Sequence, residues 1–319
     1  MFNFRAAERI LRRVEGTTSR RSSSSKRSSV ITKDGAKISY TLHRGGGEAT
    51  PLIMINGWTC TGNFWGSLLA NGQPRFVGEE RDVVTYDLRG SGDSDVTDGP
   101  YDVNMLAEDA NALIDDLELS GKVHVLGLSL GGMIAQQLAA SYPEKLASLV
   151  LCCTTAGGKR MIAANKDDAR TFFGSFRNFD DEKSKMKAAR TFVEYGLATN
   201  NQNVESSLVD SLTRSYLSES KCTVEGINAQ FGALNWKGIK DEESPSELPV
   251  LIVHGTEDRI LPYGNVEGIR EIWPRSRVLS LSGHGHFWNV TNENAARTIA
   301  SFLEDVDQGD DKIKDAYVC

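Results

Sequence analysis

Several kinds of residue or pattern that would carry a particular function are scarce in this sequence. No apolar run approaches the 18 residues that a membrane-spanning helix needs; one of the longest, 146–153, has eight and includes a serine. The five cysteines form an odd set without zinc-finger spacing, which predicts no metal site and favours a reducing intracellular compartment. Histidine is also scarce, at five residues in 319, so candidates for acid–base chemistry are few.

The bulk composition excludes other classes. Hydrophobic residues at 39% and charged residues at 25% are ordinary for a globular protein and rule out a collagen-like, mucin-like or wholly disordered chain. A chain of 319 residues is long enough for one large domain or two modest ones with a sizeable core. Thirty glycines indicate many tight turns.

Charge is distributed unevenly along the chain. Residues 1–29 hold eight of the 36 basic side chains and two of the 43 acidic ones. The remainder therefore carries a net charge of −13, although the whole chain carries only −7. So acidic a body is a poor partner for nucleic acid or anionic lipid, and we expect no nucleic-acid partner.

The basic N-terminal segment, residues 1–29, has features of a targeting peptide. An apolar helical stripe that includes Phe4 and Ile10 opposes a stripe of arginines, and a Ser/Arg-rich stretch follows it. This pattern is typical of an organelle transit peptide, most like a mitochondrial one. A disordered basic extension also fits, and a reversible membrane-surface helix is a third interpretation. In each case we expect the segment to lie outside the fold of a mitochondrial or cytoplasmic protein.

From Val30 onward the chain alternates short β-branched runs with helical patterns. Strands are expected at 36–43, 51–56, 82–87, 122–126, 146–153, 249–254 and 277–281. Helices are expected at about 62–70, 102–119, 130–142, 264–272 and 292–304. Several strands are apolar throughout, as in a sheet buried on both faces. The alternation predicts an α/β fold with a mostly parallel central sheet and helices on both faces.

The alternation stops between Thr154 and Leu248, where polar and helical patches replace the strands. An insertion of roughly 95 residues is too long for a plain loop, so we expect a helical cap over one edge of the sheet. The expected divisions are the extension 1–29, a core of 30–153 and 249–304, the cap 154–248, and an acidic tail at 305–319.

The motif with the clearest chemical meaning is a Gly-x-Ser-x-Gly pattern centred on Ser129. Its turn is so tight that a Cβ at either glycine would strike a neighbouring strand or helix, and the central serine is strained with an exposed hydroxyl. The bare pattern is weak in a chain with 30 glycines. Here, however, an expected strand directly precedes it and an expected helix directly follows, which is the setting of a nucleophilic serine. Ser129 is the candidate nucleophile.

A serine hydroxyl needs a general base, and the base needs a group that orients it. Three of the five histidines fall within or at the end of expected strands, where structural roles are typical. His284 and His286 follow the last strand and are the candidate bases. Asp258 follows the preceding strand and is the candidate orienting carboxylate, with its neighbour Glu257 as the lesser candidate.

These motifs resemble those of the α/β-hydrolase superfamily over nearly the whole of 30–304. The chain order serine, acid, histidine distinguishes this arrangement from other serine hydrolases. Further matching segments are 86–94 after a buried strand, 254–262 as the acid loop and 283–288 as the histidine loop. By this resemblance the Gly-His pair selects His284 as the base and leaves His286 as a pocket or neighbouring residue; His286 as the base is the alternative.

One segment departs from the family pattern. After its first central strand the family usually has His-Gly, whereas this chain has Asn56-Gly before Trp58. Backbone donors do not depend on side-chain identity, so the resemblance still implies an oxyanion hole formed by the N–H groups of Trp58 and Leu130. The Trp58 ring, His286 and Phe287 are expected to line a substrate pocket.

The resemblance implies a serine hydrolase that cleaves a carboxylic ester, lactone or thioester of a small to medium apolar substrate. The reaction would pass through an acyl-enzyme on Ser129, with no metal or organic cofactor. A lyase, a C–C bond hydrolase or an acyltransferase with the same triad is the second hypothesis. A ligand-binding receptor or interaction protein on this scaffold is the third. The cap is the segment that decides among them.

Overall fold

The computed structural model describes residues 25–45, 47–67, 69–70, 73–74, 81–117, 121–197, 205–240, 243–245, 247–309 and 317–318. Within these residues, nine strands form one sheet in the order β1-β2-β6-β3-β7-β8-β9-β10-β11. A separate short pair, β4 (Leu69–Ala70) and β5 (Gln73–Pro74), lies outside that sheet. Among the same residues, no helix combines the length and the apolar character needed to cross a bilayer.

The main sheet is antiparallel at one edge and parallel elsewhere. Its strands are β1 (Ser25–Ile31), β2 (Lys37–His43), β3 (Ala49–Ile55), β6 (Arg81–Tyr86), β7 (Val123–Leu128), β8 (Leu146–Cys152), β9 (Val250–Gly255), β10 (Arg277–Leu281) and β11 (Tyr317–Val318). The β1–β2 and β2–β6 pairs are antiparallel, and the remaining neighbours are parallel. Strands β7 and β9 are buried along their whole length because helices cover both faces.

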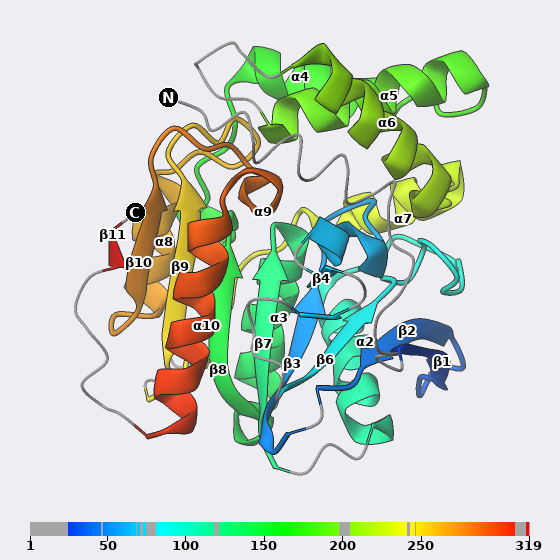
Figure 1. Ribbon diagram of the computed structural model, residues 1–319. Coiled ribbons are helices and arrows are strands. Elements are labelled where there is room, and N and C mark those ends of the chain that lie inside the picture. Colours follow the sequence, from blue (N-terminus) through cyan, green and yellow to red (C-terminus); the bar gives the residue numbers. More distant parts are fainter. Residues whose placement is uncertain are drawn as a thin grey trace.

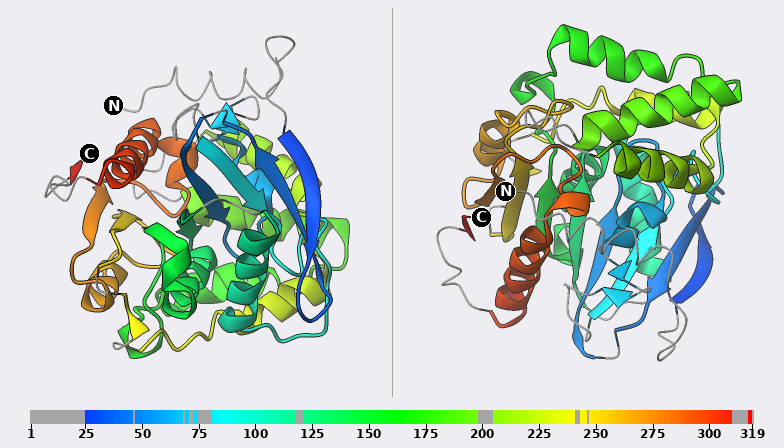
Figure 2. Two further views of the ribbon diagram at one scale, coloured as in Figure 1. Left: turned by 90° about the horizontal axis from the view of Figure 1, so that it is seen from below. Right: turned by 45° about the horizontal axis from the view of Figure 1, so that its top comes forward.

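Helices cover both faces and one end of the sheet (Figures 1 and 2). Helix α10 (Glu293–Asp307) lies on one face, and α2 (Val103–Asp116), α3 (Leu130–Ser141) and α8 (Asn265–Ile272) lie on the other. Above the carboxyl ends of the parallel strands lie α4 (Lys166–Ser175), α5 (Glu182–Leu197), α6 (Ser206–Ser220) and α7 (Val224–Ala233). The 3₁₀ turns η1 (Gly62–Ser67), η2 (Pro143–Lys145) and η3 (Gly158–Arg160) and the short α9 (Trp288–Thr291) complete the elements. The expected α/β fold, with a mostly parallel sheet and inserted helices, is confirmed.

The boundary expected at residue 30 is wrong. Residues 25–29 belong to β1, whose Val30 pairs with Ile38 of β2. Arg27 binds two carboxylates of the core, with 2.6 Å to Asp87 and 2.7 Å to Asp93. Most side chains of this edge strand are exposed, so backbone pairing and ion pairs place it, and no apolar periodicity marks it. The rest of the basic segment, residues 1–24, lies outside the described residues.

The expected start of the tail at residue 305 is also wrong. Helix α10 continues to Asp307, which lies 2.7 Å from Arg81 of β6 and 3.0 Å from His124 of β7. A short strand, β11, then pairs with β10 at Leu279 and Ser280. A carboxylate in an acidic run therefore anchors the helix, because two buried basic groups lie within its reach.

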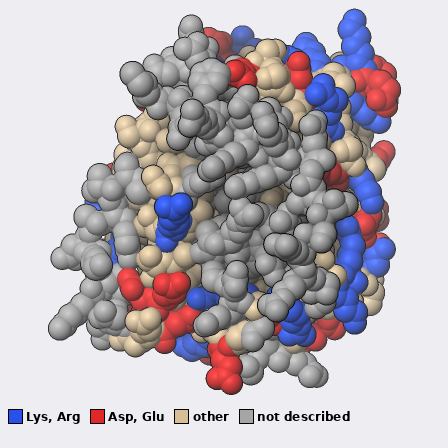
Figure 3. Space-filling view, viewed as in Figure 1, with Lys and Arg blue, Asp and Glu red and all other residues tan. Residues whose placement is uncertain are grey.

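The described surface carries mixed charge. On the face in Figure 3, Lys and Arg side chains lie next to Asp and Glu side chains along the right-hand edge. Because positive and negative side chains alternate there, the described part of this edge has no extended region of one electrostatic sign.

Strand register brings four loops to one place. Ile55 of β3 pairs with Gly127 of β7, so the chain after β3 leaves the sheet beside the turn after β7. On the other side, Gly255 of β9 pairs with Leu281 of β10, which sets the loops after those two strands at one level. In parallel sheets these carboxyl-end loops are where ligands bind.

Candidate active site

Ser129 lies in the turn between β7 and α3. Its φ of 56° is in the left-handed region that residues with a side chain rarely adopt. A Cβ on Gly127 would lie 2.2 Å from the carbonyl oxygen of Gly131, and a Cβ on Gly131 would lie 2.2 Å from that of Ile55. The two glycines are therefore obligatory, and the turn holds Ser129 on the wall of a cavity.

Neighbouring groups hold this strained turn. The Ser129 N–H donates to the carbonyl oxygen of Cys152 at the end of β8 (2.9 Å), and the Thr154 hydroxyl donates to the Ser129 carbonyl oxygen (2.7 Å). The Ser129 hydroxyl makes no hydrogen bond to any residue that the structure describes. Catalytic hydrogen bonds in unliganded sites often tighten only when substrate is bound.

Asp258 lies buried in the loop after β9. Its Oδ1 accepts from the N–H groups of Ile260 and Leu261, both at 2.9 Å, and its Oδ2 lies 2.7 Å from Nδ1 of His286. Burial alone would raise the pKa of Asp258, but the charge of His286 and the hydrogen bonds of His254 and His286 outweigh burial. They hold this pKa well below its usual range. Asp258 is therefore ionised and able to orient an imidazole.

The two histidines of the loop after β10 differ in their contacts. His286 is buried, contacts Asp258 and lines the same cavity as Ser129. His284 is partly exposed, and its Nδ1 lies 2.9 Å from the carbonyl oxygen of Ser282. The choice of His284 as the histidine paired with Asp258 is therefore wrong, and His286 occupies that position.

Backbone geometry explains the difference. The carbonyl oxygen of His284 accepts from the N–H of Glu257 at 3.0 Å, so this residue joins the two loops through its backbone. A Cβ on Gly255 would lie 2.3 Å from the same carbonyl oxygen, which shows how closely the loops approach. The side chain that reaches Asp258 comes two residues later.

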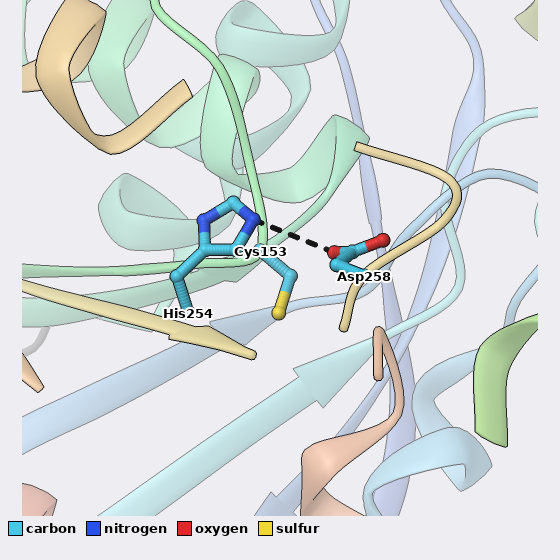
Figure 4. A group of neighbouring side chains, drawn as sticks. All are labelled: Cys153, His254 and Asp258. Atoms are coloured by element: carbon cyan, nitrogen blue, oxygen red, sulfur yellow. Dashed lines mark ion pairs between the residues drawn. The ribbon is translucent and has the colours of Figure 1, made fainter. Parts of the chain in front are cut away.

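A further histidine, His254 in β9, also approaches the carboxylate. Its Nε2 lies 2.8 Å from the carbonyl oxygen of Leu261 and 3.5 Å from Oδ2 of Asp258 (Figure 4). Cys153 belongs to the same buried group, and the ligand atoms of the three side chains lie within 4.8 Å of one another. Such residue types bind divalent metals, but burial raises the pKa of the Cys153 thiol well above its usual value. The Cys153 thiol is therefore a neutral neighbour of the acid.

The N–H groups expected to form an oxyanion hole lie on two segments that border Ser129. A Cβ on Gly57 would lie 3.3 Å from the Ser129 Cβ, so the loop that carries Trp58 runs against the serine. Leu130 is the first residue of α3, where N–H groups have no partner within the helix. Within the described residues, neither the Trp58 N–H nor the Leu130 N–H donates a hydrogen bond, so neither group is engaged by the protein.

A largely apolar cavity opens over Ser129. Its empty volume, with the opening included, is about 740 Å³, and none of the described residues that line it is Asp, Glu, Lys or Arg. Ser129, His286, the thiol of Cys60 and the indole of Trp58 are the polar side-chain groups among the described lining residues. Trp58 and Phe287, expected as pocket residues together with His286, also lie on its wall.

The cap contributes aromatic wall residues that we did not predict. Phe172 and Phe173 of α4 and Phe192 of α5 line the cavity, and the Trp58 ring packs against Phe173 at a centroid distance of 5.7 Å. The four phenylalanines at 172, 173, 176 and 179 are a visible cluster in an otherwise polar segment. That cluster was a signal for the apolar face of the cap.

An ion pair joins the cap to the acid loop. Arg259, the residue after Asp258, donates from Nε to the Asp168 carboxylate of α4 at 3.2 Å. Its guanidinium also lies 4.5 Å from the centroid of the Tyr195 ring of α5. The Asp168 pKa is lowered, chiefly by this hydrogen-bonded arginine. The cap is therefore attached beside the acid.

Comparison with known proteins identifies the family. A family model described as the α/β hydrolase fold matches residues 50–293. A pimeloyl-[acyl-carrier protein] methyl ester esterase of Aeromonas hydrophila is 28% identical over 247 residues, covering 76% of this chain and 91% of that protein. A non-heme chloroperoxidase of Streptomyces lividans is 26% identical, covering 74% and 84%. The solved structure of a hydrolase from Pseudomonas aeruginosa superposes with a TM-score of 0.70 at 26% identity, covering 87% and 98%. This chain belongs to the α/β hydrolase fold family.

Proposed function

We propose that this protein is a serine hydrolase that cleaves carboxylic esters, including lactones or thioesters, of small to medium apolar substrates. The observation that carries the proposal is the joint placement of Ser129 and His286 on one uncharged cavity, with Asp258 hydrogen-bonded behind His286. A nucleophile, a base and an oriented carboxylate are the groups that two-step acyl transfer requires.

Each group has a role in this reaction. His286, held in one tautomer by Asp258, takes the proton from Ser129 as the serine oxygen attacks the ester carbonyl. The N–H groups of Trp58 and Leu130 stabilise the resulting oxyanion. His286 then protonates the leaving alcohol, and a water molecule repeats the sequence on the acyl-enzyme.

The cavity supports an apolar substrate. A carboxylate or phosphate placed against the Trp58, Phe172 and Phe192 rings would lose its hydration without gaining a charged partner among the described lining residues. An aliphatic or aromatic acyl group would instead bury apolar surface, which stabilises binding by about 25 cal/mol per Å².

Several relatives bear names that agree with ester chemistry. Besides the methyl ester esterase, they include a poly(3-hydroxyalkanoate) depolymerase of Ectopseudomonas oleovorans and a bifunctional esterase/perhydrolase of Acinetobacter calcoaceticus. Their identities to this chain are 26% and 27%. These names support the class of reaction and leave the particular ester to be found by assay.

The test combines labelling with turnover. The purified protein is treated with a fluorophosphonate, the adduct is mapped by mass spectrometry, and p-nitrophenyl esters of increasing acyl length are assayed for wild type and Ser129→Ala. We expect the adduct on Ser129 and a loss of turnover of about 10⁴-fold or more in the variant. Ester cleavage that survives Ser129→Ala would overturn the proposal. Labelling at Ser129 without ester turnover would favour a lyase, a C–C bond hydrolase or an acyltransferase instead.

A further inference from the structure

The loop that carries the Trp58 N–H, residues 56–60, is held by the cap. Asn56 donates from Nδ2 to the Cys60 carbonyl oxygen (2.6 Å), which closes the loop on itself. Within this loop Thr59 has a φ of 63°, a costly conformation for a β-branched residue. Such a conformation persists only where surrounding contacts impose it.

Two cap side chains supply those contacts, one on each side of Thr59. The carboxamide oxygen of Gln230, in α7, accepts from the Thr59 N–H at 3.0 Å. The Cys222 thiol donates to the Thr59 carbonyl oxygen at 3.1 Å. The peptide plane before Thr59 and the plane after it are therefore both held by groups of the cap.

Gln230 is itself fixed at both ends of its carboxamide. Its Nε2 donates to the carbonyl oxygen of Arg89 at 2.8 Å, and the residue is 1% exposed. Helix α7 can come this close because Gly226 meets Gly90 without side chains: a Cβ on Gly226 would lie 2.0 Å from the Gly90 carbonyl oxygen. Thr59, Gln230 and Arg89 are all buried. Loss of the Gln230 carboxamide would therefore leave the Thr59 N–H and the Arg89 carbonyl oxygen without a hydrogen-bond partner.

The peptide plane that Gln230 holds is the one next to the proposed oxyanion donor. The Thr59 N–H points to Gln230, so the peptide unit between Trp58 and Thr59 has a fixed orientation. The Trp58 indole is held by the same helix, since its Nε1 donates to the Ile227 carbonyl oxygen at 3.2 Å. A backbone donor stabilises an oxyanion only when it is held in place before the charge develops.

We propose that Gln230 is a positioning residue for the oxyanion hole, and that through it the cap contributes to the rate of the chemical step as well as covering the substrate. The inference rests on the proposed ester hydrolysis. Cys222 acts on the same loop from the other side of Thr59 and supports the position that Gln230 sets.

The experiment compares Gln230→Met, which keeps side-chain length and removes both hydrogen bonds, with Gln230→Glu, which keeps an acceptor for Thr59. Thr213→Val is the matched control, because among the described residues the buried Thr213 hydroxyl bonds only within α6, to the Val209 carbonyl oxygen (2.7 Å). For Gln230→Met we expect kcat to fall about 10- to 100-fold while KM stays within about threefold, since the donor acts on the transition state. Gln230→Glu should regain part of the loss, and Thr213→Val should leave kcat unchanged.

Two further readouts separate positioning from folding and from the choice of substrate. The second-order rate of fluorophosphonate labelling should fall in Gln230→Met, because the phosphonyl oxygen occupies the oxyanion hole, and hydrogen exchange of the Thr59 amide should accelerate.

Labelling needs no ester turnover, so a wild-type protein that cleaves no ester contradicts the proposed function alone. A folded Gln230→Met with unchanged kcat and labelling rate would overturn the inference about Gln230. If that variant does not fold, Gln230→Leu, which also removes both hydrogen bonds, decides: a folded Gln230→Leu with the kcat and labelling rate of wild type would overturn it.

Discussion

Nδ1 of His286 lies 2.7 Å from Oδ2 of Asp258, whereas Nδ1 of His284 lies 2.9 Å from a backbone carbonyl oxygen. Two histidines separated by one glycine therefore occupy different environments, one buried against the acid and one partly exposed. This relationship assigns the base to His286 in the proposed mechanism, and the alternative can be tested directly.

His286→Ala should lower kcat/KM for an ester by about 10⁴-fold or more, because the serine then lacks its base. His284→Ala should retain activity within about threefold, since its ring does not contact Asp258 or line the cavity. The two variants are compared by steady-state kinetics on one p-nitrophenyl ester. The reverse ranking would restore His284 as the base.

Acyl-length preference should depend on the cap wall. Phe172→Ala should enlarge the cavity and raise the kcat/KM ratio of long to short acyl esters by about 10-fold. The reason is that each additional buried methylene of the acyl chain contributes about 0.8 kcal/mol of binding free energy. Phe179→Ala is the control, because Phe179 is equally buried in the cap but stacks on Phe176 outside the cavity lining. Each substitution should cost about 3–5 kcal/mol of unfolding free energy, measured in urea. An equal shift of preference in both variants would contradict the assignment of the wall.

Stability should decrease as the pH falls below about 6.5, in part because of His124. Burial lowers the pKa of His124, despite its contact with Asp307, so the folded protein holds this ring neutral while the unfolded chain protonates it. The unfolded state then binds more protons, and the free energy of unfolding falls with decreasing pH by up to about 1.4 kcal/mol per pH unit. Urea titrations between pH 7.5 and pH 5 should show a flatter dependence for His124→Gln.

The polar edge strand should contribute to stability through Arg27. Arg27→Gln removes the ion pairs to Asp87 and Asp93, and Asp87 is nearly buried, so we expect a loss of about 1 kcal/mol. Lys33→Gln is the control, because the Lys33–Glu108 pair is exposed and 3.5 Å long. Thermal unfolding of the two variants measures the difference, and equal midpoints would show that Arg27 contributes no more than a surface charge.

Features that depend on short stretches of chain could be predicted from the sequence. The turn at Ser129 is an example, because its two glycines relieve clashes with backbone that lies a few residues away or on the adjacent strand. Strands β7 and β9 could also be predicted from their apolar runs, since a strand covered on both faces has few polar positions. Strand β1 was not, because Ser and Arg side chains on an exposed edge carry no apolar alternation.

Features that depend on distant contacts were decided by the tertiary structure. The choice between His284 and His286 depends on how the loops after β9 and β10 approach each other, and spacing along the chain does not encode that approach. Gln230 is 171 positions from Thr59 and lies in a helix whose sequence gives no sign of the contact. The sequence alone thus determined the fold and marked Ser129 and Asp258 as the candidate nucleophile and acid, because these rest on local sterics and buried periodicity. Only folding placed His286 beside Asp258 and brought Gln230 of the cap to the loop at residues 56–60, because hydrogen bonds between distant segments form where the packed elements place them.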